Sequence, residues 1–125
     1  MNTCIIGIGS NLNPEKNIRE AINLLGREGK LVAVSSLVHT DPLGITDQPA
    51  FINGAVKMKT TMEKEIFRKY LKKLEDRLGR DRSQPKFGPR CIDLDIVVWN
   101  GQVVDEDYYT RGFLRDAAAE LGFVT

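Results

Sequence analysis

The order of strand-like and helix-like segments constrains this chain more than any other feature of its sequence. Apolar runs typical of strands occupy residues 3–9, 30–38, 51–59 and 91–98. Two amphipathic segments alternate with them: Asn13 and Pro14 begin the first, and a capping-box pattern at residues 60–63 begins the second. The segments therefore follow one another as strand, helix, strand, strand, helix, strand.

The C-terminal part adds a hairpin and a helix to this series. Asn100-Gly101 is a strong hairpin signal that pairs the last strand with residues 102–104, and a short helix over about residues 114–121 follows. The pattern predicts an α+β fold: a ferredoxin-like βαββαβ antiparallel sheet with helices packed on it, plus a C-terminal hairpin and helix. Without linkers or repeats, residues 1–125 are expected to form a single domain.

The composition is that of a soluble globular protein and excludes several classes of function. Of 125 residues, 42% are apolar and 28% are charged, and the net charge of +1 gives no general attraction to nucleic acid or anionic membranes. No apolar run approaches the roughly 20 residues of a membrane span, and no basic segment precedes the first apolar run. We expect a cytoplasmic monomer with no nucleic-acid or membrane partner.

Three residues limit the redox and catalytic chemistry. Cys4 and Cys91 are too few for a disulfide framework and lie in strand-like runs, where a reduced buried thiol is expected. His39 is the only histidine, which excludes metal sites built from several histidines. A module that stacks nucleic-acid bases is disfavoured as well, because the first and last strand candidates carry no aromatic residue besides Trp99 at an end.

Asp93 and Asp95 stand two residues apart inside the apolar run 91–98. Side chains at i and i+2 leave a strand on the same face, so both carboxylates should point one way with a cation between them. Arg90 is the nearest candidate in the protein, and Mg²⁺, which prefers carboxylate and phosphate oxygens, is the nearest candidate ligand. An ordinary strand with a solvated acidic face is the alternative.

A basic loop leads directly into this strand. Its glycines and prolines forbid a regular helix or strand. Four basic residues fall within eleven positions of it: Arg80, Arg82, Lys86 and Arg90. Basic groups beside a metal-bound polyphosphate are what phosphoryl transfer requires, whereas the plainer alternative is a solvated charged loop.

Several motifs make the chain resemble the 6-hydroxymethyl-7,8-dihydropterin pyrophosphokinases of folate biosynthesis. Residues 86–97 match the family signature, a basic residue followed by x-Gly-Pro-Arg-x-x-Asp-Leu-Asp and two aliphatic residues. The Gly-Ile-Gly-Ser-Asn-Leu segment at residues 7–12 matches the family's start, and residues 40–44 and 47–53 match as well. The resemblance covers most of residues 4–98, in order and at the family's spacing.

The resemblance implies transfer of the β,γ-diphosphate of ATP to the hydroxymethyl group of a reduced pterin, with release of AMP. It implies that Asp93 and Asp95 hold two Mg²⁺ ions bridging the triphosphate and the pterin hydroxyl. The catalytic residues that it implies are Arg80, Arg82, Arg90, Asp93 and Asp95. The ATP-binding residues that it implies are Glu75, Arg80, Arg82, Arg90, Ile96 (through its main chain) and Arg111.

A pterin is a flat polar heterocycle that needs aromatic stacking and hydrogen bonds at its edge. The resemblance makes Phe51 and Phe113 the stacking pair, where they would otherwise be taken as core aromatics. It makes Asn53 the amide that reads the pterin edge, and Phe87 part of a flap over the pterin. The remaining residues implied on this side are Thr40, Pro42 and Leu43.

The region after residue 100 departs from the family pattern. The family usually has a Pro-His pair before its Arg-x-Phe, with the histidine touching phosphate, but here residues 105–107 are all acidic. Arg111 and Phe113 keep the Arg-x-Phe spacing. The acidic residues should weaken ATP binding unless they face away. A non-catalytic relative that binds pterin or nucleotide is therefore the alternative function.

Overall fold

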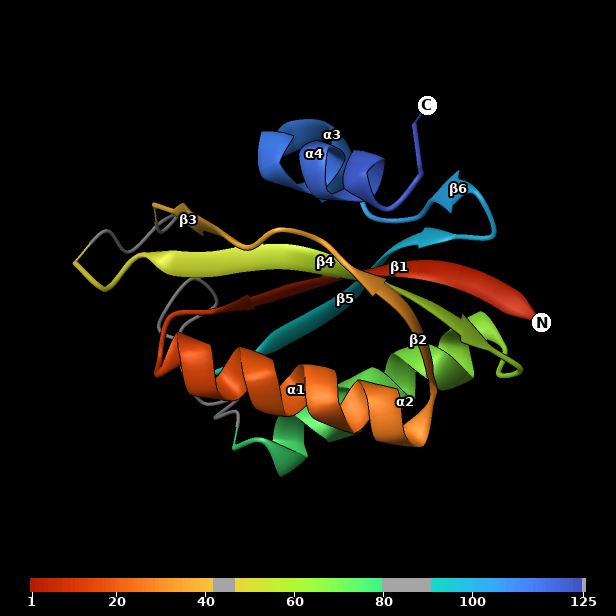
Figure 1. Ribbon diagram of the computed structural model, residues 1–125, viewed down its shortest axis with the longest axis horizontal. Coiled ribbons are helices and arrows are strands. Elements are labelled where there is room, and N and C mark those ends of the chain that lie inside the picture. The colour runs from red at the N-terminus through yellow and green to blue at the C-terminus, as the bar shows by residue number, and fades with distance from the viewer. Residues whose placement is uncertain (42–46, 80–90, 125) are drawn as a thin grey trace.

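A sheet with helices on both faces organises the chain (Figure 1), as the computed structural model of residues 1–41, 47–79 and 91–124 shows. The helices of these ranges are α1 (Pro14–Glu28), α2 (Lys64–Arg77), α3 (Asp107–Thr110) and α4 (Gly112–Glu120). The strands are β1 (Asn2–Ser10), β2 (Lys30–Val34), β3 (Val38–Thr40), β4 (Phe51–Thr60), β5 (Asp93–Trp99) and β6 (Gln102–Val103).

The central strand β1 pairs antiparallel with β4 on one side and with β5 on the other. The strand order is β2-β4-β1-β5-β6, and the short β3 pairs with the beginning of β4. The four main strands thus have the order of a ferredoxin-like βαββαβ sheet. The fold class predicted from the order of segments is confirmed.

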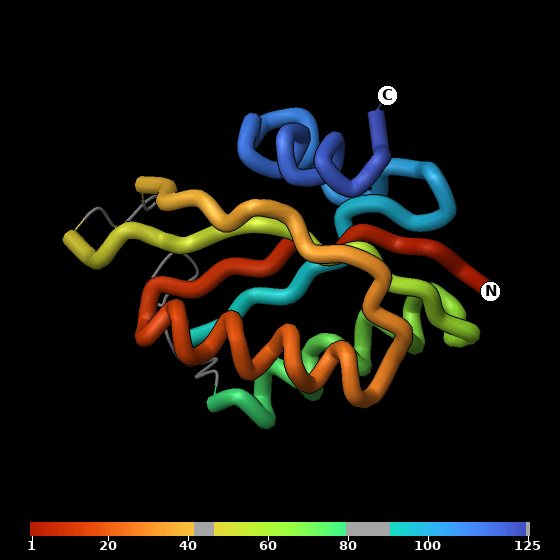
Figure 2. The backbone as a smooth tube through the Cα atoms, viewed as in Figure 1, coloured from red at the N-terminus to blue at the C-terminus, as the bar shows by residue number. Residues whose placement is uncertain are grey.

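Two helix layers cover opposite faces of the sheet: α1 and α2 pack on one face, and α3 and α4 lie over the other (Figures 1 and 2). Because successive side chains in a strand point to opposite faces, each central strand contributes to both cores. Ile6, Ile8 and Leu94 belong to the core beneath α1 and α2. Ala55 and Val97 belong to the core beneath α4.

The first helix begins as predicted, at Pro14 with Asn13 in the N-cap position, whereas the second helix begins differently. Glu63 is the N-cap residue of α2, so the capping-box prediction was wrong. Thr60 ends β4 instead, and its Oγ1 accepts a hydrogen bond from the Met62 amide. Asn13 holds the N-cap position of α1 with φ of 42°, and its carbonyl accepts the Asn17 amide. Within the described residues, neither helix has a side-chain cap at its start.

The hairpin turn and the final helix agree with the prediction, whereas one predicted strand is divided in two and a short helix is added. The apolar run 30–38 divides into β2 and β3, because the chain leaves regular pairing between Val34 and Val38. Asn100 (φ 49°) and Gly101 (φ 80°) make the predicted hairpin turn between β5 and β6. The predicted final helix is α4, and the short α3 precedes it. In the described part of the chain, no helix has the length and apolar character needed to span a membrane.

Candidate active site

Asn53, Gly9 and Asp93 form one row across three neighbouring strands. Gly9 of β1 pairs directly with Asn53 of β4 on one side and with Asp93 of β5 on the other. Directly paired residues project from the same face of a sheet, so the Asn53 and Asp93 side chains flank a position that has no side chain. The register thus brings together an amide predicted to read a pterin and a carboxylate predicted to hold a metal.

The next row places Asp95 on the same face. Asp95 pairs with Gly7 of β1. A Cβ atom on Gly7 would lie 3.3 Å from Val97 Cγ2 and 3.4 Å from Leu114 Cδ2, so this is the face that α4 covers. Leu94, between the two aspartates, packs into the core on the opposite face. Both carboxylates therefore project toward the α4 side of β5.

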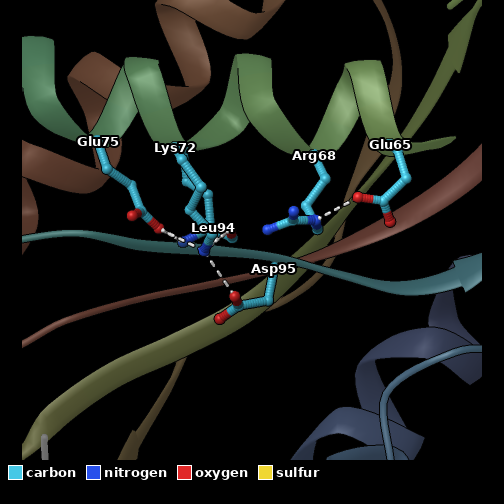
Figure 3. Close-up of polar contacts among 6 residues, drawn as sticks. All are labelled: Glu65, Arg68, Lys72, Glu75, Leu94 and Asp95. Carbon is cyan, nitrogen blue, oxygen red and sulfur yellow. Dashed lines mark hydrogen bonds and ion pairs between the residues drawn. The ribbon is translucent and has the colours of Figure 1, made fainter. Parts of the chain in front are cut away.

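An ammonium group from α2 contacts Asp95 around the edge of the sheet (Figure 3). The Nζ atom of Lys72 lies 2.8 Å from Asp95 Oδ1 and 3.1 Å from Glu75 Oε2. It also donates a hydrogen bond of 2.9 Å to the carbonyl of Leu94. The side chain of Asp95 is 48% exposed, whereas that of Glu75 is fully buried. One lysine therefore offsets the charge of a candidate metal ligand and of a buried carboxylate.

Glu75 completes the hydrogen bonding of a free sheet edge. β6 pairs only with the last two residues of β5, so within the described ranges no strand lies beside Leu94 on that side. Glu75 Oε2 accepts the Leu94 amide at 2.7 Å, and Lys72 donates to the carbonyl of the same residue. An unpaired edge needs such partners. Two α2 side chains thus take the place of a neighbouring strand and fix the segment that carries both aspartates.

The donor chemistry of this face fits Mg²⁺. Mg²⁺ takes oxygen ligands and is usually held by one or two carboxylates together with substrate phosphates. Asp93 and Asp95 supply two carboxylates on one strand face, and that of Asp95 is open to solvent. Among the residues that the structure describes, no cluster of three or more His, Cys, Asp or Glu forms a metal cage. The pair suits an ion that arrives with a phosphate ligand.

Asp105 brings further negative charge near Asp95. Burial raises the pKa of the Asp105 carboxyl above its ordinary value, and a hydrogen bond of 2.9 Å from the Asp107 amide opposes that shift. The charges of Asp107, Asp95 and Glu106 raise the pKa further. Because the charge of Asp95 contributes to the shift, this member of the acidic segment 105–107 interacts electrostatically with one of the candidate metal ligands.

The residues predicted to bind the pterin include three on paired strands. Asn53 is nearly buried, and its Nδ2 donates a hydrogen bond to Thr40 Oγ1 across the β3–β4 pair. Phe51 pairs directly with Thr40 at the beginning of β4. Phe113 is at the beginning of α4 and half-buried, with the Arg111 guanidinium carbon 5.8 Å from its ring centroid. Asn53 is therefore held rigidly, as an amide that reads a ligand edge needs to be.

The remaining predicted residues are placed as follows. Glu75 is buried against Leu94, and Ile96 lies in the core beneath α1 and α2. Arg111 contacts Phe113 as described above. The others lie outside the described residues: Pro42, Leu43, Arg80, Arg82, Phe87 and Arg90.

Sequence reasoning missed Lys72. The available signal was its place directly after the buried Leu71 and three residues before Glu75, which puts Lys72 at the margin of the buried face of α2 and beside Glu75. Its contact with Asp95 depends on how α2 lies along β5. The helix sequence alone does not contain that information.

Comparisons with known proteins identify a family that is similar to this chain. A family model described as 7,8-dihydro-6-hydroxymethylpterin-pyrophosphokinase matches residues 5–122. The 2-amino-4-hydroxy-6-hydroxymethyldihydropteridine pyrophosphokinase of Bacillus subtilis is 35% identical over 131 residues, which cover 96% of this chain and 78% of that protein. The protein of the same name from Pseudomonas aeruginosa is 39% identical over 103 residues, covering 80% and 63%.

Similarity extends to a larger plant protein. The "Folate synthesis bifunctional protein" of Arabidopsis thaliana is 34% identical to this chain over 105 residues, or 82% of the chain. The chain spans only 22% of that relative, and it spans 63% of the Pseudomonas protein.

Proposed function

The chain belongs to the 7,8-dihydro-6-hydroxymethylpterin-pyrophosphokinase family, and on that premise we propose that it transfers the β,γ-diphosphate of ATP to 6-hydroxymethyl-7,8-dihydropterin, with release of AMP, as a step of folate synthesis. The observation that carries the proposal is the row in which Asn53 and Asp93 flank Gly9. That row supports a site where a pterin edge and a metal-bound triphosphate meet on one rigid surface.

The reaction exchanges one bond at phosphorus for another. The pterin hydroxymethyl oxygen attacks the β-phosphorus of ATP, and the bond from that phosphorus to the α,β-bridging oxygen breaks. AMP departs with the bridging oxygen, and the hydroxyl proton passes to water. When held by Asp93 and Asp95, two Mg²⁺ ions would offset the charge of the triphosphate and acidify the hydroxyl.

The residues of the chain bind and orient the two substrates. We assign the pterin edge to Asn53 and its faces to Phe51 and Phe113, while Arg111 pairs with phosphate. Thr40 supports this assignment because its hydroxyl accepts the Asn53 amide hydrogen and so fixes which way that amide points. Holding the hydroxyl and the phosphorus in line is what accelerates a reaction of this kind.

The remaining assignments rest on the family signature. Arg80, Arg82 and Arg90 offset charge on the phosphate oxygens and exclude water, and Phe87 covers the pterin. Glu75 and the main chain of Ile96 contribute on the nucleotide side, while Pro42 and Leu43 complete the pterin wall.

The observation about Asp105 favours a second candidate, a relative that binds pterin or nucleotide without turnover. A carboxylate that interacts electrostatically with Asp95 would also repel a triphosphate bound there. The intact pair of Asp93 and Asp95 weighs against this candidate, since two carboxylates that can hold a pair of metal ions are what the transfer reaction itself requires.

We also propose that the reaction takes place in the cytoplasm. Cys4 is a free buried thiol, and burial raises its pKa to about 12, so it stays protonated and unreactive. Cys91 forms no disulfide with another described residue. Free thiols are typical of a reducing compartment.

The test is pterin-dependent formation of AMP from Mg-ATP. We expect AMP to form only when 6-hydroxymethyl-7,8-dihydropterin is present, and Asp95→Asn to abolish it. Asp116→Asn, which removes one negative charge from the exposed surface of α4, is the matched control and should retain turnover. If the wild-type protein binds pterin or ATP but forms no AMP above the Asp95→Asn level, the non-catalytic candidate is correct.

A further inference from the structure

Lys72 is held in a fixed place by oxygen atoms that it contacts on two elements. Its ammonium lies 2.8 Å from Asp95 Oδ1, 2.9 Å from the Leu94 carbonyl oxygen and 3.1 Å from Glu75 Oε2. An ammonium group has three hydrogens, and these three acceptors can engage all of them. Lys72 therefore acts as a bound cation at a carboxylate that the proposed function assigns to a metal.

The two cations compete for Asp95. An oxygen engaged by an ammonium is less available to a metal ion, and a divalent ion beside Lys72 meets like-charge repulsion. Lys72 does not have to lose its other contacts in order to release Asp95. Glu75 and the Leu94 carbonyl are separate anchors at the β5 edge, so a rotation of the flexible side chain can release Asp95 while keeping them.

We propose that Lys72 is the resident counter-ion of Asp95 in the metal-free protein and makes metal binding depend on nucleotide. This inference rests on the proposed function, because it takes Asp95 as a metal ligand. A free divalent ion has to displace the ammonium and gives it no new partner. An ion bound to ATP brings phosphate oxygens with it, so the displaced ammonium exchanges one anion for another. Lys72 is a positioning residue in this account, and it couples the two ligands.

A purely structural role for Lys72 is the competing explanation. Glu75 is fully buried, and Lys72 would in that case only offset its charge. The two explanations differ in their consequences for metal affinity. If the role of Lys72 is only structural, its replacement by a neutral residue lowers stability and leaves the affinity of Asp95 for a free divalent ion unchanged or weaker. If Lys72 competes with the metal, the same replacement raises that affinity.

The experiment measures binding of Mn²⁺ by electron paramagnetic resonance, with and without an ATP analogue whose α,β-bridge is a methylene group. The full chain is compared with Lys72→Gln, which is neutral and can still donate to the Leu94 carbonyl, and with Lys72→Arg, which keeps the charge. Lys73→Gln makes the same charge change at the next position of α2, where the side chain is exposed. Circular dichroism of each variant establishes that it is folded.

Without nucleotide, we expect Lys72→Gln to bind Mn²⁺ about tenfold more tightly than wild type, and Lys72→Arg and Lys73→Gln to match wild type. With the analogue present, the gain should shrink or reverse, so that the coupling between Mn²⁺ and nucleotide falls in Lys72→Gln alone. Unchanged or weaker Mn²⁺ binding by folded Lys72→Gln without nucleotide overturns the proposal.

An additional variant separates this inference from the proposed function. If Asp95→Asn abolishes the Mn²⁺ binding seen in the wild-type protein, but Lys72→Gln does not change Mn²⁺ affinity, only the proposed role of Lys72 is wrong. If Mn²⁺ binding is insensitive to Asp95→Asn, the metal site itself is wrong, and the inference about Lys72 is refuted with it.

Discussion

Asn53 and Asp93 lie on opposite sides of Gly9 in a single row of the sheet. Both belong to strands that pair directly with β1, so their separation is set by sheet geometry rather than by a loop. A site assembled on paired strands holds its groups more precisely than one assembled on connecting segments. This is what an in-line transfer between two bound substrates requires.

Gly9→Ala should weaken pterin binding selectively. A Cβ at this position would overlap the Asn53 side-chain oxygen, so that side chain has to turn and give up its hydrogen bond to Thr40. We expect pterin affinity, measured by isothermal titration calorimetry, to fall about tenfold, the effect of losing one well-placed hydrogen bond. ATP affinity should change little.

Gly26→Ala is the control for this change. Gly26 lies within α1, where a Cβ would make an ordinary contact of 3.7 Å with Leu31 Cδ2, so the variant should be as stable as wild type or about 1 kcal/mol more stable. Equal loss of pterin and ATP binding in Gly9→Ala would contradict the assignment of Asn53 to the pterin.

Glu75→Ala should destabilise the fold strongly in the absence of ligands. The substitution leaves the buried Leu94 amide without its acceptor and removes a partner of Lys72. We expect a loss of about 3 kcal/mol in the free energy of unfolding, measured in urea. Glu75→Gln keeps an acceptor oxygen and should lose less.

Glu65→Ala provides the comparison at an exposed ion pair on the same helix. Glu65 contacts Arg68 with both side chains largely in solvent, so its loss should cost well under about 1 kcal/mol (Figure 3). If Glu75→Ala proved as mild as Glu65→Ala, the edge of β5 would not depend on α2 in the way described.

Phe113→Leu should separate a stacking role from a packing role. Leucine retains apolar bulk beside the α4 core but removes the flat ring. We expect stability to fall by no more than about 1.5 kcal/mol, as for a hydrophobic exchange of similar volume, while fluorescence titration shows clearly weaker pterin binding.

Phe123→Leu makes the same change elsewhere in that core, where the ring packs edge-on against Tyr108 at 5.7 Å between centroids. It should leave pterin affinity at the wild-type level. Equal effects of the two variants on pterin binding would indicate that both act through the packing of α4.

Asp105→Asn should stabilise the protein, and more so at neutral than at acid pH. The pKa of Asp105 is raised in the folded state, so the folded protein holds this proton more tightly than the unfolded chain does. Stability contributed by the protonated form is therefore lost as pH rises from the unfolded pKa through the folded pKa. Asparagine does not ionise and avoids this loss.

Urea unfolding at a series of pH values checks this expectation. The advantage of Asp105→Asn should grow as pH rises through the range in which carboxyl groups ionise and disappear below it. Asp116→Asn controls for the general loss of one negative charge. A benefit of Asp105→Asn that is the same at every pH would argue against an ionisation effect.

Features governed by local patterning could be predicted from the sequence. The apolar run 91–98 predicted a strand, and the spacing of Asp93 and Asp95 placed both on one face; the pairing of β5 with β1 has that geometry. The Asn100-Gly101 turn required two positive φ angles, and both are present. These outcomes depend on neighbours in sequence, so the sequence contains the necessary information.

Features governed by contacts between distant segments could not be predicted. The row of Asn53, Gly9 and Asp93 requires the register of two strand pairs, which no single strand specifies. The contact of Lys72 with Asp95 requires the position of a helix along a sheet edge. The false capping box at Thr60 arose because that residue pairs with Asn2 in the sheet, and sheet pairing overrode the local helix signal.

The most direct test of the account identifies both products of a single turnover. Mass spectrometry and ³¹P nuclear magnetic resonance of a reaction with Mg-ATP and 6-hydroxymethyl-7,8-dihydropterin should find one AMP and one pterin diphosphate for each ATP consumed. The diphosphate should carry the β- and γ-phosphorus of that ATP. Formation of ADP with a pterin monophosphate, or of AMP and free diphosphate with the pterin unchanged, would contradict the account.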